Sequence, residues 1–438
     1  MAVLVWRDGL QGEPSSEFSA FVRAQSAQGR LVVQPRMGLV TLGGMRAGLR
    51  AVKAAAAVTV GTITLDSFTR VGNHGAAREA LRSGHALNGF PIVVHGGLAT
   101  RKALRGVDGP AFPVQVRHGS AAPSRIMEEL LLAGIGATEG GPVSYCLPYS
   151  RMPLREAITR WREACRVLVS AGPGDRGVHL ESFGGCLLGQ LCPPALLVAC
   201  SVLECLFFRQ HGVRSVSVSY AQQTNVAQDV EAVGALHALA ARFLGPADWH
   251  SVVYTWMGLF PSTAAGASAV LRDSARLAVR TGVGRLIVKT AAEARRLPRV
   301  ADNVAALEDA HDTAERHRAD RGPAGAVWAS ADSETYVQAR ALIEAVLELD
   351  EDIGQGLATA FERGILDIPY CLHPDNANQA RAALDGDGRL HWASIGSMPL
   401  PGVGARAGDL APAGSTALLH MLGHMQRRYD QAPLTGTV

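Results

Sequence analysis

Short apolar runs rich in β-branched residues alternate along the chain with longer stretches whose apolar residues recur at helical spacing. This alternation is typical of βα repeats, in which helices cover parallel strands. We expect strands at Leu31–Val33, Val58–Leu65, Ile92–His95, Val114–Val116, Val178–Leu180, Ser215–Ser219, Ser251–Tyr254 and Leu286–Val288, with a weaker ninth candidate at Ile135–Thr138. Helical stretches between them include Ser124–Ala133, Leu154–Ser170, Pro194–Gln210 and Val230–Phe243.

Eight or nine strands in this alternation favour a (β/α)8 TIM barrel over a doubly wound sheet, because no phosphate-binding G-x-G-x-x-G follows the first strand. We expect residues 1–30 to form an N-terminal extension and residues 31–325 to form the barrel with the substrate site. Residues 326–400 are expected to form a C-terminal α+β cap, with helices at Ser333–Leu349 and Ile353–Arg363. Residues 401–438 are expected to be a loop followed by a helix.

The composition of the 438 residues is that of a globular chain without a basic nucleic-acid surface. Hydrophobic residues make up 47%, and 42 basic against 39 acidic residues give a net charge of only +3. The longest apolar run, Pro193–Phe208, is interrupted by Glu204 and is too short to cross a membrane, so it reads as a buried helix. Seven Cys without a C-x-x-C pair exclude a disulfide scaffold and common zinc sites. With no signal peptide apparent, we expect a cytoplasmic protein without membrane or nucleic-acid partners.

Charged residues follow several predicted strands at the point where each strand ends. They are Arg36, Arg70, Arg117, Glu139, Glu181 and Lys289, and Lys289 is one of only three lysines in the chain. In a barrel the carboxyl ends of the strands meet at one mouth, where active sites lie. We therefore expect these side chains to converge.

Three guanidinium groups at one mouth would repel one another unless anions pair with them. Arginine binds a carboxylate through a planar two-pronged fork, so Arg36, Arg70 and Arg117 suit a small dicarboxylate, with Glu139 facing an ammonium group. The alternative is that each arginine stands singly on a solvated loop or closes a structural ion pair.

Other polar residues carry less information. Tyr145 and Tyr149 are either hydroxyl donors to a ligand or packing residues, and His95 and His118 are either catalytic or structural. No H-E-x-x-H spacing supports a metal site, and no G-x-S-x-G motif supports serine hydrolysis.

Several segments resemble the large (epsilon) chain of glutamate mutase, also called methylaspartate mutase. The resemblance runs in order from about residue 31 to residue 397. Its segments include Gln34-Pro35-Arg36-Met37-Gly38, Thr64-Leu65-Asp66-Ser67-Phe68-Thr69-Arg70, Leu87-Asn88-Gly89-Phe90-Pro91, Gln115-Val116-Arg117-His118-Gly119, Glu139-Gly140-Gly141, Glu181-Ser182-Phe183-Gly184, Trp256-Met257-Gly258 and Ile287-Val288-Lys289-Thr290.

This resemblance implies an isomerase that interconverts L-glutamate and (2S,3S)-3-methylaspartate by a radical rearrangement of the carbon skeleton. It assigns substrate binding to Arg36, Arg70, Arg117, Glu139, Tyr145 and Tyr149, and catalysis to Glu139 and Arg117.

The resemblance also implies adenosylcobalamin as cofactor, with Gly38, Asn88, Phe183, Tyr254, Lys289 and Glu293 as cofactor-binding residues. The chain has no D-x-H-x-x-G cobalamin signature. We therefore expect a small cobalamin-binding (sigma-type) subunit as partner, with a homodimer of large chains inside a heterotetramer.

The chain departs from the family where Tyr254-Thr255-Trp256 stands in place of His-Gln-Trp, so Tyr254 replaces a family histidine. Two alternatives therefore stay open beside glutamate mutase. One is a cobalamin-dependent mutase acting on a modified glutamate, and the other is a non-catalytic barrel that binds a dicarboxylic amino acid.

Overall fold

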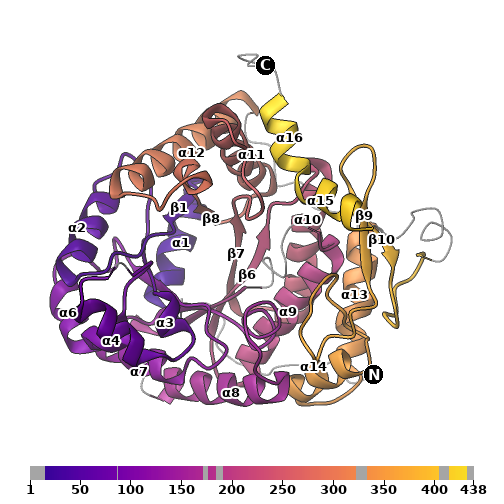
Figure 1. The fold of residues 1–438 in the computed structure, drawn as a ribbon, viewed down its shortest axis with the longest axis horizontal. Coiled ribbons are helices and arrows are strands. Elements are labelled where there is room, and N and C mark those ends of the chain that lie inside the picture. Colours follow the sequence, from indigo (N-terminus) through magenta and orange to yellow (C-terminus); the bar gives the residue numbers. More distant parts are fainter. Residues whose placement is uncertain are drawn as a thin grey trace.

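The computed structural model describes residues 15–85, 87–170, 176–183, 191–321, 333–403 and 414–431. Its centre is an eight-stranded parallel sheet in which β1 pairs with β8. A backbone bridge between Val33 and Thr59 joins the first strand to the segment before the second and closes the barrel, so the expected (β/α)8 fold is confirmed (Figure 1). The strands are β1 (Val32–Pro35), β2 (Gly61–Thr64), β3 (Val114–Arg117), β4 (Ala137–Gly140), β5 (His179–Ser182), β6 (Ser215–Ala221), β7 (Asp248–Tyr254) and β8 (Arg285–Val288).

Helices surround the strands as a ring (Figure 1). They are α2 (Leu42–Lys53), α3 (Ser67–Arg70), α4 (His74–Arg82), α5 (Ile92–His95), α6 (Gly97–Leu104), α7 (Ser124–Ala133), α8 (Leu154–Ser170), α9 (Pro194–Gln210), α10 (Val226–Leu244), α11 (Ala264–Thr281), the 3-10 turn η3 (Ala291–Ala294) and α12 (Val300–Arg321). The helix α9 is buried along almost its whole length, because β6, α10 and a helix of the C-terminal region all pack on it. This packing explains the apolar run in the sequence.

The prediction of a strand at Ile92–His95 was wrong, because these residues form the single helical turn α5. Pro91 precedes the turn and Gly96 ends it with φ +83°, a conformation that glycine adopts readily. The fourth strand is instead β4, which overlaps the weak candidate Ile135–Thr138 and extends two residues beyond it. A run of four apolar residues cannot by itself distinguish a strand from a buried helical turn.

The expected N-terminal extension includes a helix that closes the amino end of the barrel. Residues 1–14 lie outside the described residues, and α1 (Glu17–Ala27) follows them. Phe18 enters the barrel, where its ring centroid lies 5.1 Å from that of His179 and 4.9 Å from Cζ of Arg285. Asp248, at the start of β7, accepts hydrogen bonds from the side chains of Ser15 at 3.0 Å and Ser19 at 2.7 Å.

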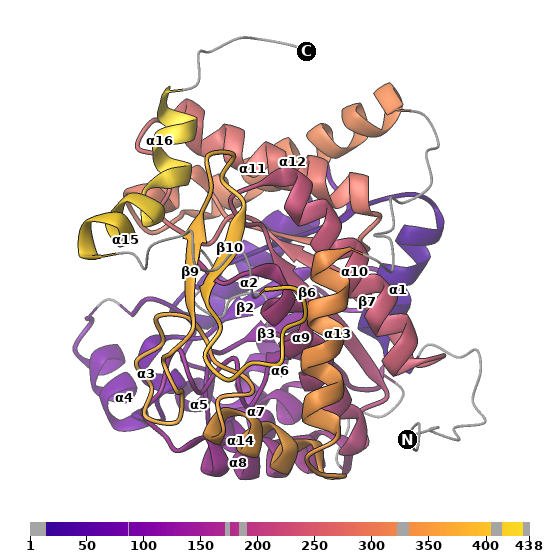
Figure 2. The same cartoon turned by 90° about the vertical axis from the view of Figure 1, so that its right-hand side faces the viewer.

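The C-terminal region covers one side of the barrel as the expected α+β cap (Figure 2). Within residues 326–400 it contains α13 (Glu334–Leu347), α14 (Ile353–Glu362) and the antiparallel strands β9 (Arg381–Leu384) and β10 (Leu390–Ser394). In residues 401–438, where a loop and one helix were expected, two helices lie among the described residues, α15 (Ser415–Leu422) and α16 (His424–Gln431). The helix α13 packs on α9 and α10, and α14 packs on α8 and α9. The predicted boundary at residue 325 and most of the predicted loop after residue 400 lie outside the described residues. None of the described helices has the length and apolarity needed to cross a membrane.

We predict that Phe18→Ala lowers the free energy of unfolding by about 3–5 kcal/mol, because it leaves a cavity among the rings at the barrel end. Urea unfolding of the full chain measures the change. The matched control is Phe21→Ala on the same helix, whose side chain is only partly buried and should cost less. Equal losses in the two variants would contradict the role of Phe18.

Candidate active site

The carboxyl ends of the strands bring most of the predicted site residues to one mouth. Arg36 directly follows β1, and Arg70 ends the short helix α3 after β2. Arg117 is the last residue of β3, Glu139 lies in β4, and Lys289 follows β8. The parallel arrangement therefore places these charges at the same end of the barrel, as the sequence predicts.

Arg117 and Glu139 form a buried ion pair at the centre of this mouth. Nη2 of Arg117 lies 2.8 Å from Oε2 of Glu139, and the two side chains are 4% and 1% exposed. The guanidinium group also lies over aromatic rings, with Cζ 5.5 Å from the ring centroid of Phe183 and 5.0 Å from that of Tyr254. Tyr145 donates a hydrogen bond to Oε1 of Glu139. Aromatic and hydrogen-bond contacts thus hold the pair in one orientation.

A second layer of charge lies beneath this pair, inside the barrel. Glu181 of β5 accepts hydrogen bonds from Arg285 and from the hydroxyl of Tyr254, and its Oε1 lies 3.3 Å from Nη1 of Arg117. Arg285 and Glu181 are fully buried. The sequence did not predict Arg285, because this residue opens an apolar strand. It did predict that Glu181 lies among the converging charges, because Glu181 stands at the end of a strand.

The protonation of these carboxyl groups follows from burial and from the two arginines. Burial alone would raise the pKa of Glu181, but Arg285 and Arg117 outweigh it, and the pKa falls to about 2. Burial raises the pKa of Glu139 above its usual value, although the charge of Arg117 opposes the rise. Burial also disfavours the charge on Arg117, yet Glu139 and Glu181 raise its pKa well above the ordinary value. Arg117 therefore stays charged.

Arg36 and Arg70 flank this central pair and are partly exposed. The charge of Arg36 opposes the rise in the pKa of Glu139, and Nη1 of Arg36 lies 3.8 Å from Oε2 of Glu293. Arg70 lies against the backbone of Gly119, where an added Cβ would approach its Nε to 2.9 Å. Nε of both Arg36 and Arg70 is buried without a hydrogen-bond partner among the described residues. The structure thus places Arg117 and Arg36 where their charges act on Glu139, and it places Arg70 on the wall of a cavity that Tyr145 also lines.

The predicted tyrosines line the site, whereas the predicted histidines are neutral or structural. Tyr145 packs on Phe183 with ring centroids 4.7 Å apart, whereas Tyr149 is exposed on the wall of the mouth. Burial and the charges of Arg70 and Arg117 lower the pKa of His118 to about 3, so this imidazole is neutral. Nε2 of His95 lies 2.7 Å from the carbonyl oxygen of Val40 on the outside of the barrel, which is a structural role.

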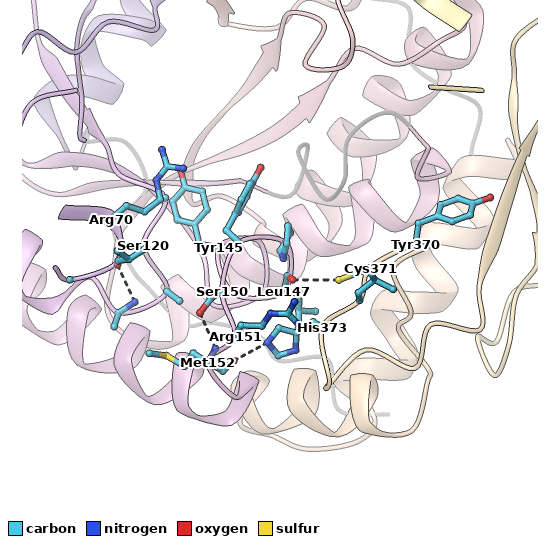
Figure 3. A pocket seen from close by; sticks show the side chains of 18 residues that line it. Arg70, Ser120, Tyr145, Leu147, Ser150, Arg151, Met152, Tyr370, Cys371 and His373 are labelled. Carbon is cyan, nitrogen blue, oxygen red and sulfur yellow. Dashed lines mark hydrogen bonds between the residues drawn. The ribbon is translucent and has the colours of Figure 1, made fainter. Parts of the chain in front are cut away.

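A cavity of about 710 Å³ opens beside these residues. Arg70 and Tyr145 lie on its barrel side, and Tyr370, Cys371 and His373 of the cap lie on the other side (Figure 3). Tyr370 has φ +61°, an uncommon conformation for a tyrosine, at the point where the cap reaches the mouth. The C-terminal region therefore supplies part of the wall of this cavity.

The predicted cofactor residues fall into two groups. Lys289 and Glu293 meet at the mouth, with Nζ 3.4 Å from Oε2, and Lys289 also lies over the ring of Phe260. An ammonium group beside a carboxylate is a donor and acceptor set that fits the two hydroxyls of a ribose. Like Lys289 and Glu293, the other predicted cofactor residues have contacts within the chain. Asn88 accepts a hydrogen bond from the backbone of Ser67.

Gly38, Phe183 and Tyr254 likewise have structural contacts. A Cβ at Gly38 would overlap the carbonyl oxygen of Thr64, so glycine is needed there for close packing of the backbone. Phe183 and Tyr254 pack edge to face with ring centroids 5.4 Å apart, and the Tyr254 hydroxyl points to Glu181. Their predicted role toward a cofactor stays a prediction.

Comparison with known proteins shows one family. The family described as methylaspartate mutase E chain (MutE) matches residues 13–405 of the chain. A glutamate mutase epsilon subunit of Halobacterium salinarum is 31% identical over 398 residues, which cover 88% of this chain and 81% of that protein. The corresponding subunits of Desulfitobacterium hafniense and Escherichia coli O157:H7 are 29% and 28% identical, with the same coverage.

We predict that the stability contributed by Glu181 depends on pH. Because its folded pKa of about 2 lies below the ordinary 4.5, this contribution is complete above pH 4.5 and is lost as the pH falls toward 2. The shift corresponds to about 3 kcal/mol. Urea unfolding of the wild type and of Glu181→Gln between pH 7 and pH 3 tests this, because the difference between them should shrink at low pH. A difference that stays constant over this range would contradict it.

Proposed function

The chain belongs to the methylaspartate mutase E chain family, and we propose that it is the catalytic chain of an adenosylcobalamin-dependent glutamate mutase. Its reaction is the interconversion of L-glutamate and (2S,3S)-3-methylaspartate. The names of its relatives support this assignment. The observation that carries it is the buried Arg117–Glu139 pair, with Arg36 close enough to act on the pKa of Glu139 and Arg70 on the wall of the adjoining cavity.

These groups match the charges of a dicarboxylic amino acid. Glutamate carries two carboxylates and one ammonium group, and the mouth offers three guanidinium groups together with Glu139, whose carboxylate is not held by Arg285. We assign the ammonium group to Glu139 and the carboxylates to the arginines. The unpartnered Nε atoms of Arg36 and Arg70 are available donors for such a ligand.

The charged layer beneath the site, formed by Glu181 and Arg285, keeps the substrate-binding Arg117 in one position. Glu181 takes one prong of the Arg117 fork, so the other prong stays directed at Glu139 and the mouth. Arginine keeps its charge at any working pH, and its planar fork limits rotation of a bound carboxylate. Because the rearrangement breaks and reforms a carbon–carbon bond, holding both ends of the substrate in a site that excludes water is the main task of the chain.

The proposal includes adenosylcobalamin, which supplies the radical chemistry when bound. Lys289 and Glu293 are the residues that would hold its ribose hydroxyls, because they combine a donor and an acceptor at the mouth. Phe260 beneath Lys289 restricts the position of the ammonium group. These residues fit the cofactor, although Gly38 and Asn88 already have contacts of their own.

We further propose that the cobalamin arrives on a separate small subunit. The loops at the carboxyl end carry exposed apolar side chains, which is unusual on a surface that only faces water. They are Val71, Tyr149, Leu259, Leu297 and Leu372, and Leu372 is 75% exposed. Their position around the mouth supports a partner that covers it. The homodimer within a heterotetramer stays a prediction.

A modified glutamate is the second candidate substrate. Tyr254 at the site and the extent of the cavity beyond Arg70 favour it, since 710 Å³ exceeds what free glutamate fills. A barrel that only binds the amino acid is the third candidate.

Reconstitution tests the three candidates. We expect the chain, mixed with a small cobalamin-binding subunit, adenosylcobalamin and L-glutamate, to form 3-methylaspartate with a cob(II)alamin signal in electron paramagnetic resonance. A signal that needs another amino acid would support the second candidate. Glutamate binding in calorimetry without any signal would support the third and contradict the proposed activity.

We predict that Arg117→Lys lowers turnover by about 10²-fold, because one ammonium group cannot contact Glu139 and Glu181 together in the geometry of the fork. Steady-state kinetics measure the loss, and circular dichroism checks that the variant is folded. The matched control is Arg125→Lys on the outer helix α7, which should leave turnover unchanged. Full activity of Arg117→Lys would show that Arg117 does not hold the substrate.

A further inference from the structure

One carboxylate lies inside α9, a helix that is buried along almost its whole length. Glu204 is in the middle of α9 and is fully buried. No ion pair to Glu204 is present in the part of the chain that the structure describes. Removing an unpaired carboxylate from water is costly, so its retention needs strong hydrogen bonds in return. Burial raises its pKa to about 7, even though several donors favour the charged form.

The hydrogen-bond donors come from the loop that follows β4. Oε1 of Glu204 accepts hydrogen bonds from the backbone N–H groups of Val143 at 3.0 Å and Ser144 at 2.9 Å. The hydroxyl of Ser144 donates to Oε2 at 2.8 Å. The backbone N–H of Phe183, just after β5, also favours the charged form of Glu204 and so opposes the rise of its pKa. Glu204 therefore holds the loop after β4 and faces the end of β5.

Gly141 is an independent sign that the loop is shaped around this carboxylate. A Cβ on Gly141 would overlap the carboxyl group of Glu204. Its backbone is not in the left-handed region, so an alanine could adopt the conformation if the carboxylate were absent. Steric space, and not backbone freedom, is the reason for glycine at this position.

The loop after β4 and the end of β5 carry aromatic residues of the site. Tyr145 follows Ser144 directly and donates its hydroxyl proton in a hydrogen bond to Glu139. Phe183 packs on Tyr145 and lies 5.5 Å from Cζ of Arg117. Displacement of the loop would therefore change the orientation of both members of the central ion pair.

We propose that Glu204 is a positioning residue of the mutase site, which holds Tyr145 and Phe183 against the Arg117–Glu139 pair from the helix behind them. Glu204 does not reach the mouth, so it acts only through these neighbours. The part of this inference that concerns turnover rests on the proposed function, and the part that concerns loop order does not.

The first test compares Glu204→Leu with Glu204→Gln in the reconstituted enzyme. Leucine leaves the N–H groups of Val143 and Ser144 without an acceptor, and we expect kcat to fall by about 10²-fold. Glutamine keeps a carbonyl oxygen for both groups and should restore most of kcat. The matched control is Glu129→Leu, which removes a buried carboxylate bonded to the backbone of Gly97 between α6 and α7.

Equal losses of kcat in Glu204→Leu and Glu129→Leu at equal loss of stability would overturn the positioning role. A Glu204→Gln variant as inactive as Glu204→Leu would also overturn it, because the acceptor is then not what matters.

A second test is a double-mutant cycle with Gly141→Ala. Alone, this substitution should lower kcat, because its methyl group displaces the carboxylate. In the Glu204→Ala background the space is free, and we expect little further loss. Additive losses would show that Gly141 and Glu204 act independently.

Hydrogen exchange separates failure of this inference from failure of the proposed function. In the isolated chain, the amides of Val143 and Ser144 should exchange much faster in Glu204→Leu than in the wild type, whatever reaction the enzyme performs. Unchanged exchange would overturn the inference even in an active mutase. A wild type that forms no 3-methylaspartate but shows the expected exchange would refute only the proposed activity.

Discussion

The arrangement of charges at the mouth of the barrel depends on one buried carboxylate, Glu181, which is held between two arginines. Arg285 lies below it and Arg117 above it, and the three groups cross the interior of the barrel from its closed end toward its mouth. With Glu139 the layer contains two positive and two negative charges, so no net charge is buried. Removing one member leaves an unpaired charge in a medium of low dielectric constant, which is far more costly than losing a surface ion pair. The arrangement therefore holds Arg117 in place before any ligand arrives.

Much of the fold could be predicted from the sequence, because most of its strands are apolar and β-branched. The failures have physical causes. Ile92–His95 has the composition of a strand but too few residues to show a period. The strand β4 carries Glu139, and the burial of this carboxylate depends on Arg117 from another strand. Local composition cannot show a partner that the fold brings from elsewhere.

The same reason explains which site residues were predicted. Arg36, Arg70 and Arg117 follow strands, so the barrel geometry is enough to bring them together. Arg285 and Glu204 instead lie within apolar segments, where a charged residue is usually exposed or paired. The interruption of the run Pro193–Phe208 by Glu204 was a visible signal, but its meaning required the loop that it holds. Residues that support a site from behind are harder to find than residues that line it.

The helix α1 closes the amino end of the barrel. Phe18 and its hydrogen-bonded neighbours fill that end, whereas the cavity of about 710 Å³ opens at the carboxyl end. A second protein seated over that opening would trap whatever lies inside. Neither a reactant nor a product could leave in that state, so the exchange of ligands would be limited by how often such a protein moved away.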